Sequence, residues 1–213
     1  MLFRSGTGDG AFLAELLRSG FTGVVGIEPS RAPIEAAKLI HLSGYSFFAP
    51  APRAAALATM ARAKALGVAV SIDPASAGFL REIGAEQFLA WTAGAQMIFP
   101  NGDEAEVLTG SSRDDEQLQR LASQYPIVVI KRGAAGAQMA AGETRWSLPA
   151  PAVEAIDTTG AGDAFVASFL ASWLRGSDPE QCLAQAIAAG SLATRAPGGR
   201  PAPAGDTVVR VRT

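Results

Sequence analysis

Short apolar runs alternate with helical patterns along most of this chain, and that alternation constrains the fold more than any other feature. Runs with the length and character of buried strands occupy residues 39–45, 68–73, 96–100, 127–131 and 137–141. Helical patterns lie among and after them, at residues 53–66, 79–90, 116–125 and 179–193. Continuous apolar strands separated by helices are typical of a parallel sheet that has helices on both faces. We therefore predict an α/β fold with a mostly parallel sheet.

The composition excludes several classes of protein. Of the 213 residues, 48% are hydrophobic and 18% are charged, so the chain can bury a sizeable core. A formal net charge of −2 gives no basic surface for nucleic acid. The single cysteine, Cys182, cannot form an internal disulfide, which suits a cytoplasmic location, and we expect it to pack inside a helix. No apolar run reaches the roughly 18 residues of a membrane span, so we expect no membrane partner.

A glycine-rich turn at residues 157–165 runs directly into an apolar helical pattern. Aromatic and aliphatic side chains recur at helical spacing from Phe165 onward, so we expect a helix to begin near Asp163. Gly160 and Gly162 let the backbone approach a ligand closely because they carry no Cβ atom. The unpaired N–H groups at the start of a helix attract an anion. The turn is therefore a candidate anion-binding site.

The carboxylate of Asp163 needs a separate explanation, because it would repel a phosphate that was merely bound. It fits a site in which Asp163 takes a proton from an attacking hydroxyl while the N–H groups hold the transferring phosphoryl group. The alternative is an ordinary helix cap, since aspartate often precedes a helix.

Residues 157–165 resemble, nearly letter for letter, the second signature of the ribokinase-like (PfkB) family of carbohydrate kinases. The resemblance implies a ribokinase-like fold and ATP-dependent phosphorylation of a sugar hydroxyl. It also implies that Asp163 is the catalytic base, and that the backbone of Gly160, Ala161 and Gly162 forms the anion hole. A small-molecule sugar or sugar acid would be the substrate.

Asn101 and Glu104 follow the strand predicted at residues 96–100, where open α/β sheets bind ligands. Asn-x-x-Glu matches the magnesium and phosphate motif of the same family. Chemically, Glu104 can hold a hydrated Mg²⁺ ion and Asn101 can donate a hydrogen bond to a phosphate of ATP. The alternative is a helix start, because asparagine caps helices and an early glutamate suits the helix dipole.

Two further segments correspond to nucleotide-binding parts of the family. The first is the turn after the strand at residues 127–131, where Lys131 could neutralise phosphate charge or, alternatively, end the strand in solvent. The second is the segment around Pro197, which resembles the lining of the adenine pocket and, with backbone carbonyls of Asp157 and Thr159, a monovalent cation site for K⁺. The residues implied in nucleotide binding are Asn101, Lys131, Arg132, Gly133, Ala134, Ala135, Gly136, Ala196, Gly198 and Gly199.

Two polar residues near strand ends are expected to be structural. Kinase relatives often have asparagine and arginine after the aspartate that corresponds to Asp73, whereas Ala75 and Ala77 stand here. We therefore expect Asp73 to cap a turn. His41 is expected to be a core or strand-end histidine rather than a ligand.

Residues 1–38 differ from the rest of the chain, and their origin is left open. A glycine-rich turn at residues 5–10 precedes a helical pattern at 11–18, a strand at 24–27 and then Glu28. Glycines followed about 20 residues later by an acid are typical of a nucleoside-binding βαβ unit. The segment is similar to the first motifs of class I S-adenosylmethionine-dependent methyltransferases; the alternative is an ordinary surface turn.

The kinase resemblance covers residues 39–213, whereas intact members of the family are longer. Their opening third supplies a glycine-rich sugar-binding motif, the first strands of the sheet and a small lid, none of which is found here. We therefore expect a ribokinase-like domain truncated at its N-terminus, with impaired activity and an exposed sheet edge that favours association. A homodimer is the form of association considered. Three alternatives to an active kinase remain: a nucleotide-binding remnant without turnover, a methyltransferase fragment and a purely structural module.

Overall fold

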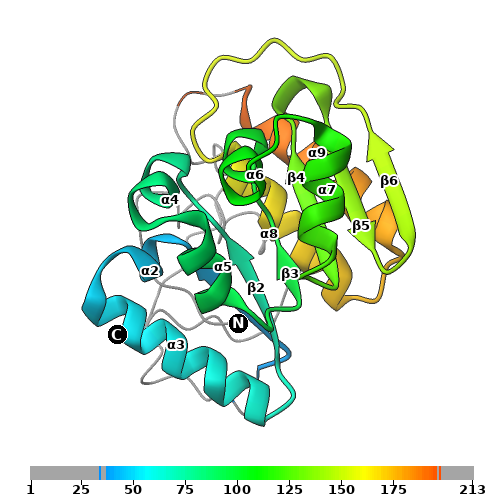
Figure 1. Cartoon of the computed structure of the whole chain (residues 1–213). Helices are drawn as coiled ribbons and strands as arrows, with labels where there is room; N and C mark the ends of the chain where they lie inside the picture. Colours follow the sequence, from blue (N-terminus) through cyan, green and yellow to red (C-terminus); the bar gives the residue numbers. More distant parts are fainter. Residues whose placement is uncertain (1–33, 35–36, 196, 198–213) are drawn as a thin grey trace.

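The computed structural model describes residues 34, 37–195 and 197, and these build a six-stranded sheet with helices on both faces. The strands lie side by side in sequence order (Figure 1). The first four strands run parallel to one another, the fifth runs antiparallel to the fourth, and the sixth runs antiparallel to the fifth. The predicted mostly parallel α/β sheet is confirmed. The strands are β1 (Leu39–Ser43), β2 (Ala69–Asp73), β3 (Met97–Ile98), β4 (Ile127–Lys131), β5 (Ala137–Ala141) and β6 (Thr144–Leu148).

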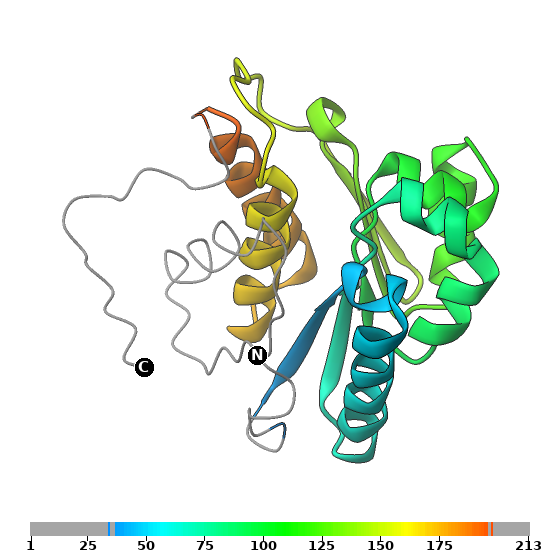
Figure 2. The ribbon, with the colours of Figure 1, turned by 90° about the vertical axis from the view of Figure 1, so that its left-hand side faces the viewer.

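The helices form two layers, one on each side of the sheet, as Figure 2 shows. A short helix, α2 (Tyr45–Phe48), follows β1. The first layer consists of α3 (Pro50–Ala65), α4 (Ala77–Ile83), α5 (Ala85–Thr92), α6 (Gly102–Thr109) and α7 (Asp114–Ala122). The opposite layer consists of α8 (Ala161–Leu174) and α9 (Pro179–Ala193). The glycine-rich turn at residues 157–165 thus leads into α8, which lies on the opposite face of the sheet from α3–α7.

The sheet separates two apolar cores, and β4 contributes to both. Val128 and Ile130 belong to the core under α3–α7, whereas Val129 belongs to the core under α8 and α9. In this second core Phe99 meets Phe169 edge to face, with ring centroids 5.1 Å apart. Side chains alternate between the two faces of a strand, so a strand covered on both faces must be apolar throughout. That requirement explains the continuous apolar runs of the sequence.

Several boundaries differ from those predicted. The helix predicted at residues 79–90 is two helices, α4 and α5, because Gly84 between them has φ = +84°, a conformation that interrupts a helix. The helix predicted at 116–125 begins at Asp114 and ends at Ala122. The strand predicted at 96–100 is reduced to Met97–Ile98. Strand β6 and helix α2 were not predicted, because neither has a clear apolar period.

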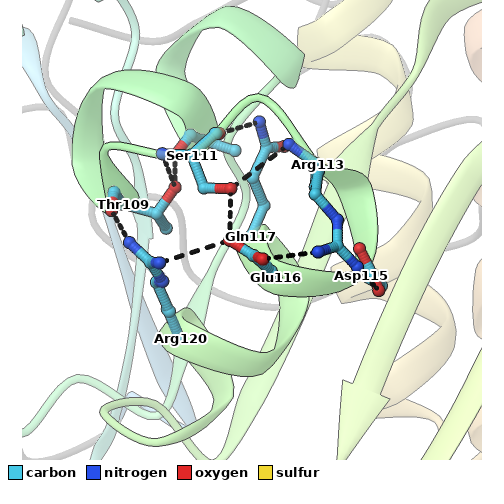
Figure 3. A network of polar contacts seen from close by, with 8 residues as sticks. Thr109, Ser111, Arg113, Asp115, Glu116, Gln117 and Arg120 are labelled. Atoms are coloured by element: carbon cyan, nitrogen blue, oxygen red, sulfur yellow. Dashed lines mark hydrogen bonds and ion pairs between the residues drawn. The ribbon is translucent and has the colours of Figure 1, made fainter.

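A polar network fixes the connection between α6 and α7 (Figure 3). Glu116 is its centre: its carboxylate accepts hydrogen bonds from Ser111 Oγ at 2.7 Å, Arg113 Nη1 at 2.8 Å and Arg120 Nη2 at 3.2 Å. Gln117, which is buried, donates to the carbonyl oxygen of Ser111 at 2.7 Å. Exposed ion pairs contribute little stability by themselves, so the network mainly sets the geometry of the turn.

None of the described helices combines the length and the apolar character that a membrane span requires. Cys182 is buried in α9, as predicted. The patterns predicted at residues 5–28 and the tail after Pro197 lie outside the described residues, as do Ala196, Gly198 and Gly199.

The turn between β4 and β5 depends on a glycine at position 136. Gly136 has φ = +95° and ψ = −130°, and a Cβ atom there would overlap the carbonyl oxygen of Leu148. We expect Gly136→Ala to lower the free energy of unfolding by more than about 2 kcal/mol, because strain and overlap add. Gly142→Ala is the matched control: its φ is +58° but its surroundings are open, so about 1 kcal/mol is expected. Urea denaturation measures both, and equal losses would contradict this account.

Candidate active site

The carboxyl ends of the parallel strands bring polar residues from distant parts of the chain to one edge of the sheet. Asp73 ends β2, Asn101 follows β3, and Lys131 ends β4. The backbone holds two of these ends together, because Lys131 N–H donates to the Pro100 carbonyl at 2.9 Å and Asn101 bridges to Lys131 in parallel register. Open α/β sheets bind ligands at this edge, so it is where a site is expected.

Helix α8 begins at Ala161, two residues before the predicted start. Its N-cap is Gly160, with φ = +77°, and no side chain caps the helix. Asp163 is half-buried in the first turn, so it is not the N-cap residue and that alternative interpretation is wrong. The N–H of Ala161 donates to the Thr158 carbonyl at 3.2 Å, which closes the turn. The carboxylate of Asp163 therefore stands beside the helix N-terminus.

Lys131 forms a buried ion pair at this edge. Its Nζ atom lies 2.6 Å from Asp73 Oδ2, and the two side chains are 14% and 15% exposed. The alternative interpretation of Lys131 as a strand end in solvent is therefore wrong. Burial opposes the ammonium charge, but the carboxylates of Asp73, Glu104 and Asp163 outweigh it, and the pKa of Lys131 is raised. Lys131 is thus a cation at neutral pH.

Asn101 and Glu104 form a reciprocal helix cap at the start of α6. Glu104 N–H donates to Asn101 Oδ1 at 2.9 Å, and the Glu104 carboxylate accepts from Asn101 N–H at 2.8 Å and from Asn101 Nδ2 at 2.9 Å. The helix-start interpretation of both residues is therefore realised. Glu104 is 2% exposed. Burial, and next the negative charge of Asp73, raise the pKa of Glu104 to about 7.

A pocket of about 530 Å³ opens beside α8 and α9. Its walls are mainly apolar, with Ala150, Val153, Phe165 and Ile187 among them, and Lys131 is the one charged residue among the described residues of the lining. The loop after β6 is tied to α9, because the carbonyl oxygen of Thr194 accepts from the N–H groups of residues 156 and 157 at 2.8 and 3.1 Å. A volume of this size with apolar walls and one charged end suits a nucleoside that carries phosphates.

The pocket gathers six of the residues that the sequence placed in nucleotide or anion binding: Lys131, Gly133, Ala134, Gly136, Ala161 and Gly162. Arg132 turns elsewhere. Its side chain is 11% exposed, pairs with Asp114 at 3.1 Å and donates to Gln138 at 3.2 Å, so it is not among the pocket-lining residues. Five further predicted site residues also lie outside the pocket lining: Asn101, Glu104, Ala135, Gly160 and Asp163.

Asp157 stabilises the turn that precedes α8. Its Oδ1 atom accepts a hydrogen bond from Thr159 N–H at 2.9 Å, and its own N–H donates to the Thr194 carbonyl. Asp157 thereby links the glycine-rich turn to the end of α9. A cation site on the backbone carbonyls of Asp157 and Thr159 stays a prediction.

Asp73 is the site residue that sequence reasoning missed. It does cap a turn, since Oδ1 accepts from Ala75 N–H at 3.0 Å, but Oδ2 binds Lys131. The sequence did contain a signal for this ion pair, because Asp73 and Lys131 each end a strand predicted for the same sheet. His41 is structural as expected: it is 4% exposed and lies 2.9 Å from Ser71 Oγ, and burial lowers its pKa to about 4.

The acidic residues suit a hydrated Mg²⁺ ion better than a fully protein-bound metal. Among the residues that the structure describes, no three His, Cys, Asp or Glu side chains converge to hold a metal. Mg²⁺ is usually bound by one or two carboxylates, by water and by substrate phosphates. Glu104 supplies a carboxylate of that kind at the edge of the sheet, within electrostatic range of Asp73.

Comparison with known proteins assigns the family. The model of the pfkB family carbohydrate kinases matches residues 25–204. The chain belongs to the PfkB family. The match starts at residue 25, within the N-terminal segment of open origin, rather than at residue 39.

PfkB relatives share both sequence and fold with this chain. An ATP-dependent ribose-1-phosphate kinase from Halopiger xanaduensis is 35% identical over 144 residues, which is 67% of this chain and 45% of the relative. The crystal structure of a probable sugar kinase from Rhizobium etli CFN 42 superposes with a TM-score of 0.76 at 25% identity, covering 82% of this chain and 55% of the other.

A mutant fructokinase from Vibrio cholerae O395 also superposes, with a TM-score of 0.70 at 28% identity over 76% of this chain and 56% of the other. That structure holds fructose, ADP and a potassium ion. The chain spans about half the length of these relatives.

The raised pKa of Glu104 gives stability a defined pH dependence. Between pH 4.5, its ordinary pKa, and about 7, the folded protein binds this proton more tightly than the unfolded chain. The contribution of Glu104 to the free energy of unfolding therefore falls as pH rises through that window. Glu104→Gln removes this dependence and can keep the reciprocal cap.

We expect the stability of Glu104→Gln relative to the wild type to rise between pH 4.5 and 8 by on the order of 1 to 3 kcal/mol. Urea denaturation across that range measures the difference. Glu106→Gln, the same substitution on the exposed side of α6, is the matched control. A difference that stays constant with pH would show that the Glu104 carboxyl titrates normally.

Proposed function

We propose that this chain carries the catalytic and nucleotide-binding parts of an ATP-dependent phosphotransferase that acts on a sugar hydroxyl. The observation that carries the proposal is the position of Asp163. It stands in the first turn of α8, directly after Gly162, which lines the nucleoside-sized pocket, and within electrostatic range of the Lys131 ammonium, which lines the pocket too. Membership of the PfkB family supports the same assignment.

The polarity of the pocket lining supports one orientation of the nucleotide. Its apolar wall, which includes Val153 and Ile187, would take the base and ribose, and its charged end would take the phosphates. Asn101 and Glu104 would hold Mg²⁺ and phosphate oxygens at the adjacent strand end. When bound, the Mg²⁺ ion would neutralise charge on the phosphates. Since ATP is the phosphoryl donor in this proposal, the protein would act in the cytoplasm.

The chemistry assigned to the chain's own residues is proton transfer and charge stabilisation. Asp163 would accept the proton of the acceptor hydroxyl as its oxygen attacks the γ-phosphorus, and the bond from that phosphorus to the leaving oxygen of ADP breaks. The N–H groups of Gly160 and Gly162, and that of Ala161 in place of its hydrogen bond to the Thr158 carbonyl, would hold the equatorial oxygens of the transferring group. Lys131 would offset the negative charge of these oxygens.

For the molecule that accepts the phosphoryl group, we propose a chemical class rather than one compound. The Halopiger relative is named for ribose-1-phosphate, and the fructokinase structure holds fructose. We extend the proposal to a small sugar or sugar acid, and to a K⁺ ion on the carbonyl oxygens of Asp157 and Thr159. That fructokinase holds a potassium ion, which supports the cation.

Calorimetry with ATP–Mg²⁺ and with S-adenosylmethionine tests the pocket. We expect ATP to bind and S-adenosylmethionine not to bind. Ser191→Trp should weaken ATP binding at least tenfold, because the indole would fill space that the half-buried Ser191 leaves open in the pocket wall. Ser147→Trp on the exposed side of β6 is the control. Unchanged ATP affinity in Ser191→Trp would remove the nucleotide from this pocket.

Asp163→Asn separates binding from chemistry. ATP affinity should be retained or increased, because the substitution removes a negative charge that faces phosphate. Sugar-dependent release of ADP, measured against a panel of pentoses, hexoses and keto-sugar acids, should fall by about 10²- to 10⁴-fold. Turnover equal to that of the wild type would refute the role of Asp163 as base, and ATP binding without turnover in the wild type would indicate a nucleotide-binding protein.

A further inference from the structure

The ion pair between Asp73 and Lys131 joins two strand ends that are not neighbours. Asp73 ends β2 and Lys131 ends β4, and β3 lies between these strands in the sheet. The Nζ–Oδ2 distance of 2.6 Å is that of a short, charge-assisted hydrogen bond. Both side chains are at most 15% exposed. The pair therefore crosses the end of β3 at the edge of the sheet where the pocket opens.

An ion pair that is at most 15% exposed is not explained by stability alone. Removing two charges from water costs about as much as their attraction returns, so apolar side chains could fill the same space. What the pair does provide is orientation. A lysine side chain has four flexible methylene groups, and a fixed carboxylate restricts where its ammonium can lie.

The ammonium is held beside the anion-binding turn of α8. A Cβ atom placed on Gly162 would lie 3.7 Å from Lys131 Nζ, and both residues line the pocket. An ammonium has three N–H donors, and Asp73 takes one of them. Across the described part of the chain, no second acceptor lies within hydrogen-bond distance of Nζ. Two donors are therefore available at the charged end of the pocket.

Two carboxylates besides that of Asp73 also attract the Lys131 ammonium. Glu104 and Asp163 both contribute to the raised pKa of Lys131, so both lie within electrostatic range. Asp163 is the proposed base, and an ammonium paired with it would hold its proton-accepting oxygen. The 2.6 Å contact with Asp73 Oδ2 therefore gives the ammonium a direct carboxylate partner other than the proposed base.

We propose that Asp73 is a positioning residue: it holds the Lys131 ammonium beside Gly162, where the two remaining N–H donors bind the terminal phosphates of a nucleoside triphosphate. This inference rests on the proposed function and adds to it a role for Asp73, which contacts neither nucleotide nor sugar. Lys131 acts on the phosphates, and Asp73 acts through Lys131.

A double-mutant cycle tests the proposal, with affinities for ATP and adenosine measured by calorimetry. Lys131→Met should lower the ratio of ATP affinity to adenosine affinity by on the order of 10- to 100-fold, as expected for a lost charge-assisted hydrogen bond. Asp73→Asn should lower the same ratio by about tenfold. Because Asp73 acts through Lys131, the double variant should be no worse than Lys131→Met. Asp73→Glu, which restores a carboxylate, should recover part of the loss.

Two measurements distinguish a positioning role of Asp73 from a metal-binding role and from a purely structural role. The effect of Asp73→Asn should persist without Mg²⁺, whereas an effect confined to Mg²⁺-containing buffer would overturn the proposal in favour of metal binding. A purely structural role would lower the adenosine affinity and the melting temperature without changing the ratio, and would overturn it too. Lys64→Met and Asp115→Asn, the same substitutions at exposed positions, are the matched controls.

The affinity for inorganic tripolyphosphate tests the role of Asp73 independently of the proposed function. The wild type should bind it, and Lys131→Met and Asp73→Asn should each bind it at least several-fold more weakly. Tripolyphosphate binding without ATP binding would refute the proposed function and retain the inference. Equal tripolyphosphate affinity in all variants, or additive losses in the double variant, would overturn the inference itself.

Discussion

The close packing of α8 against α9 and the sheet is the constraint on which the site depends. Phe169 of α8 meets Phe99 from the end of β3, and Gly190 of α9 brings the two helices together. A Cβ atom on Gly190 would lie 3.3 Å from the Ala161 carbonyl oxygen, in the first turn of α8. The absence of a side chain at Gly190 therefore lets the first turn of α8 approach α9 closely. Because the core beneath α8 is apolar and closely packed, the helix N-terminus and its glycine backbone are set at the strand ends with little freedom to move.

Charge at the site is arranged around one buried cation. Three carboxylates, those of Asp73, Glu104 and Asp163, all act on the Lys131 ammonium. They differ in what else they do: Asp73 contacts the ammonium directly, Glu104 caps α6, and Asp163 stands in the first turn of α8. Burial, and next the negative charge of Asp73, raise the pKa of Glu104, so gathering these carboxylates in a partly buried site is costly. A site of this composition would gain stability from a bound cation near Glu104.

Local signals in the sequence were sufficient for the fold, and six of the predicted site residues line one pocket. Apolar runs such as 127–131 predicted β4 at its observed bounds, because a strand buried on both faces cannot contain alternating polar residues. The helix at Pro179–Ala193 was likewise predicted at its bounds. The break at Gly84 was missed because a single glycine is compatible with a helix, and only its positive φ ends α4 there. Strand β6 was missed because it is an edge strand with mostly polar, exposed side chains.

Asp73 shows why a local prediction of function fails even where the fold is correct. Its neighbours Pro74 and Ala75 indicate a turn cap, and the hydrogen bond from Ala75 N–H agrees with that. Its second role depends on a lysine 58 positions later in the sequence, which the sheet brings within 2.6 Å. The dependence runs in both directions, because an ammonium as buried as that of Lys131 requires a carboxylate partner. The lysine at position 131 therefore finds its direct partner in the acid that ends β2, and the two residues have to be interpreted as one unit.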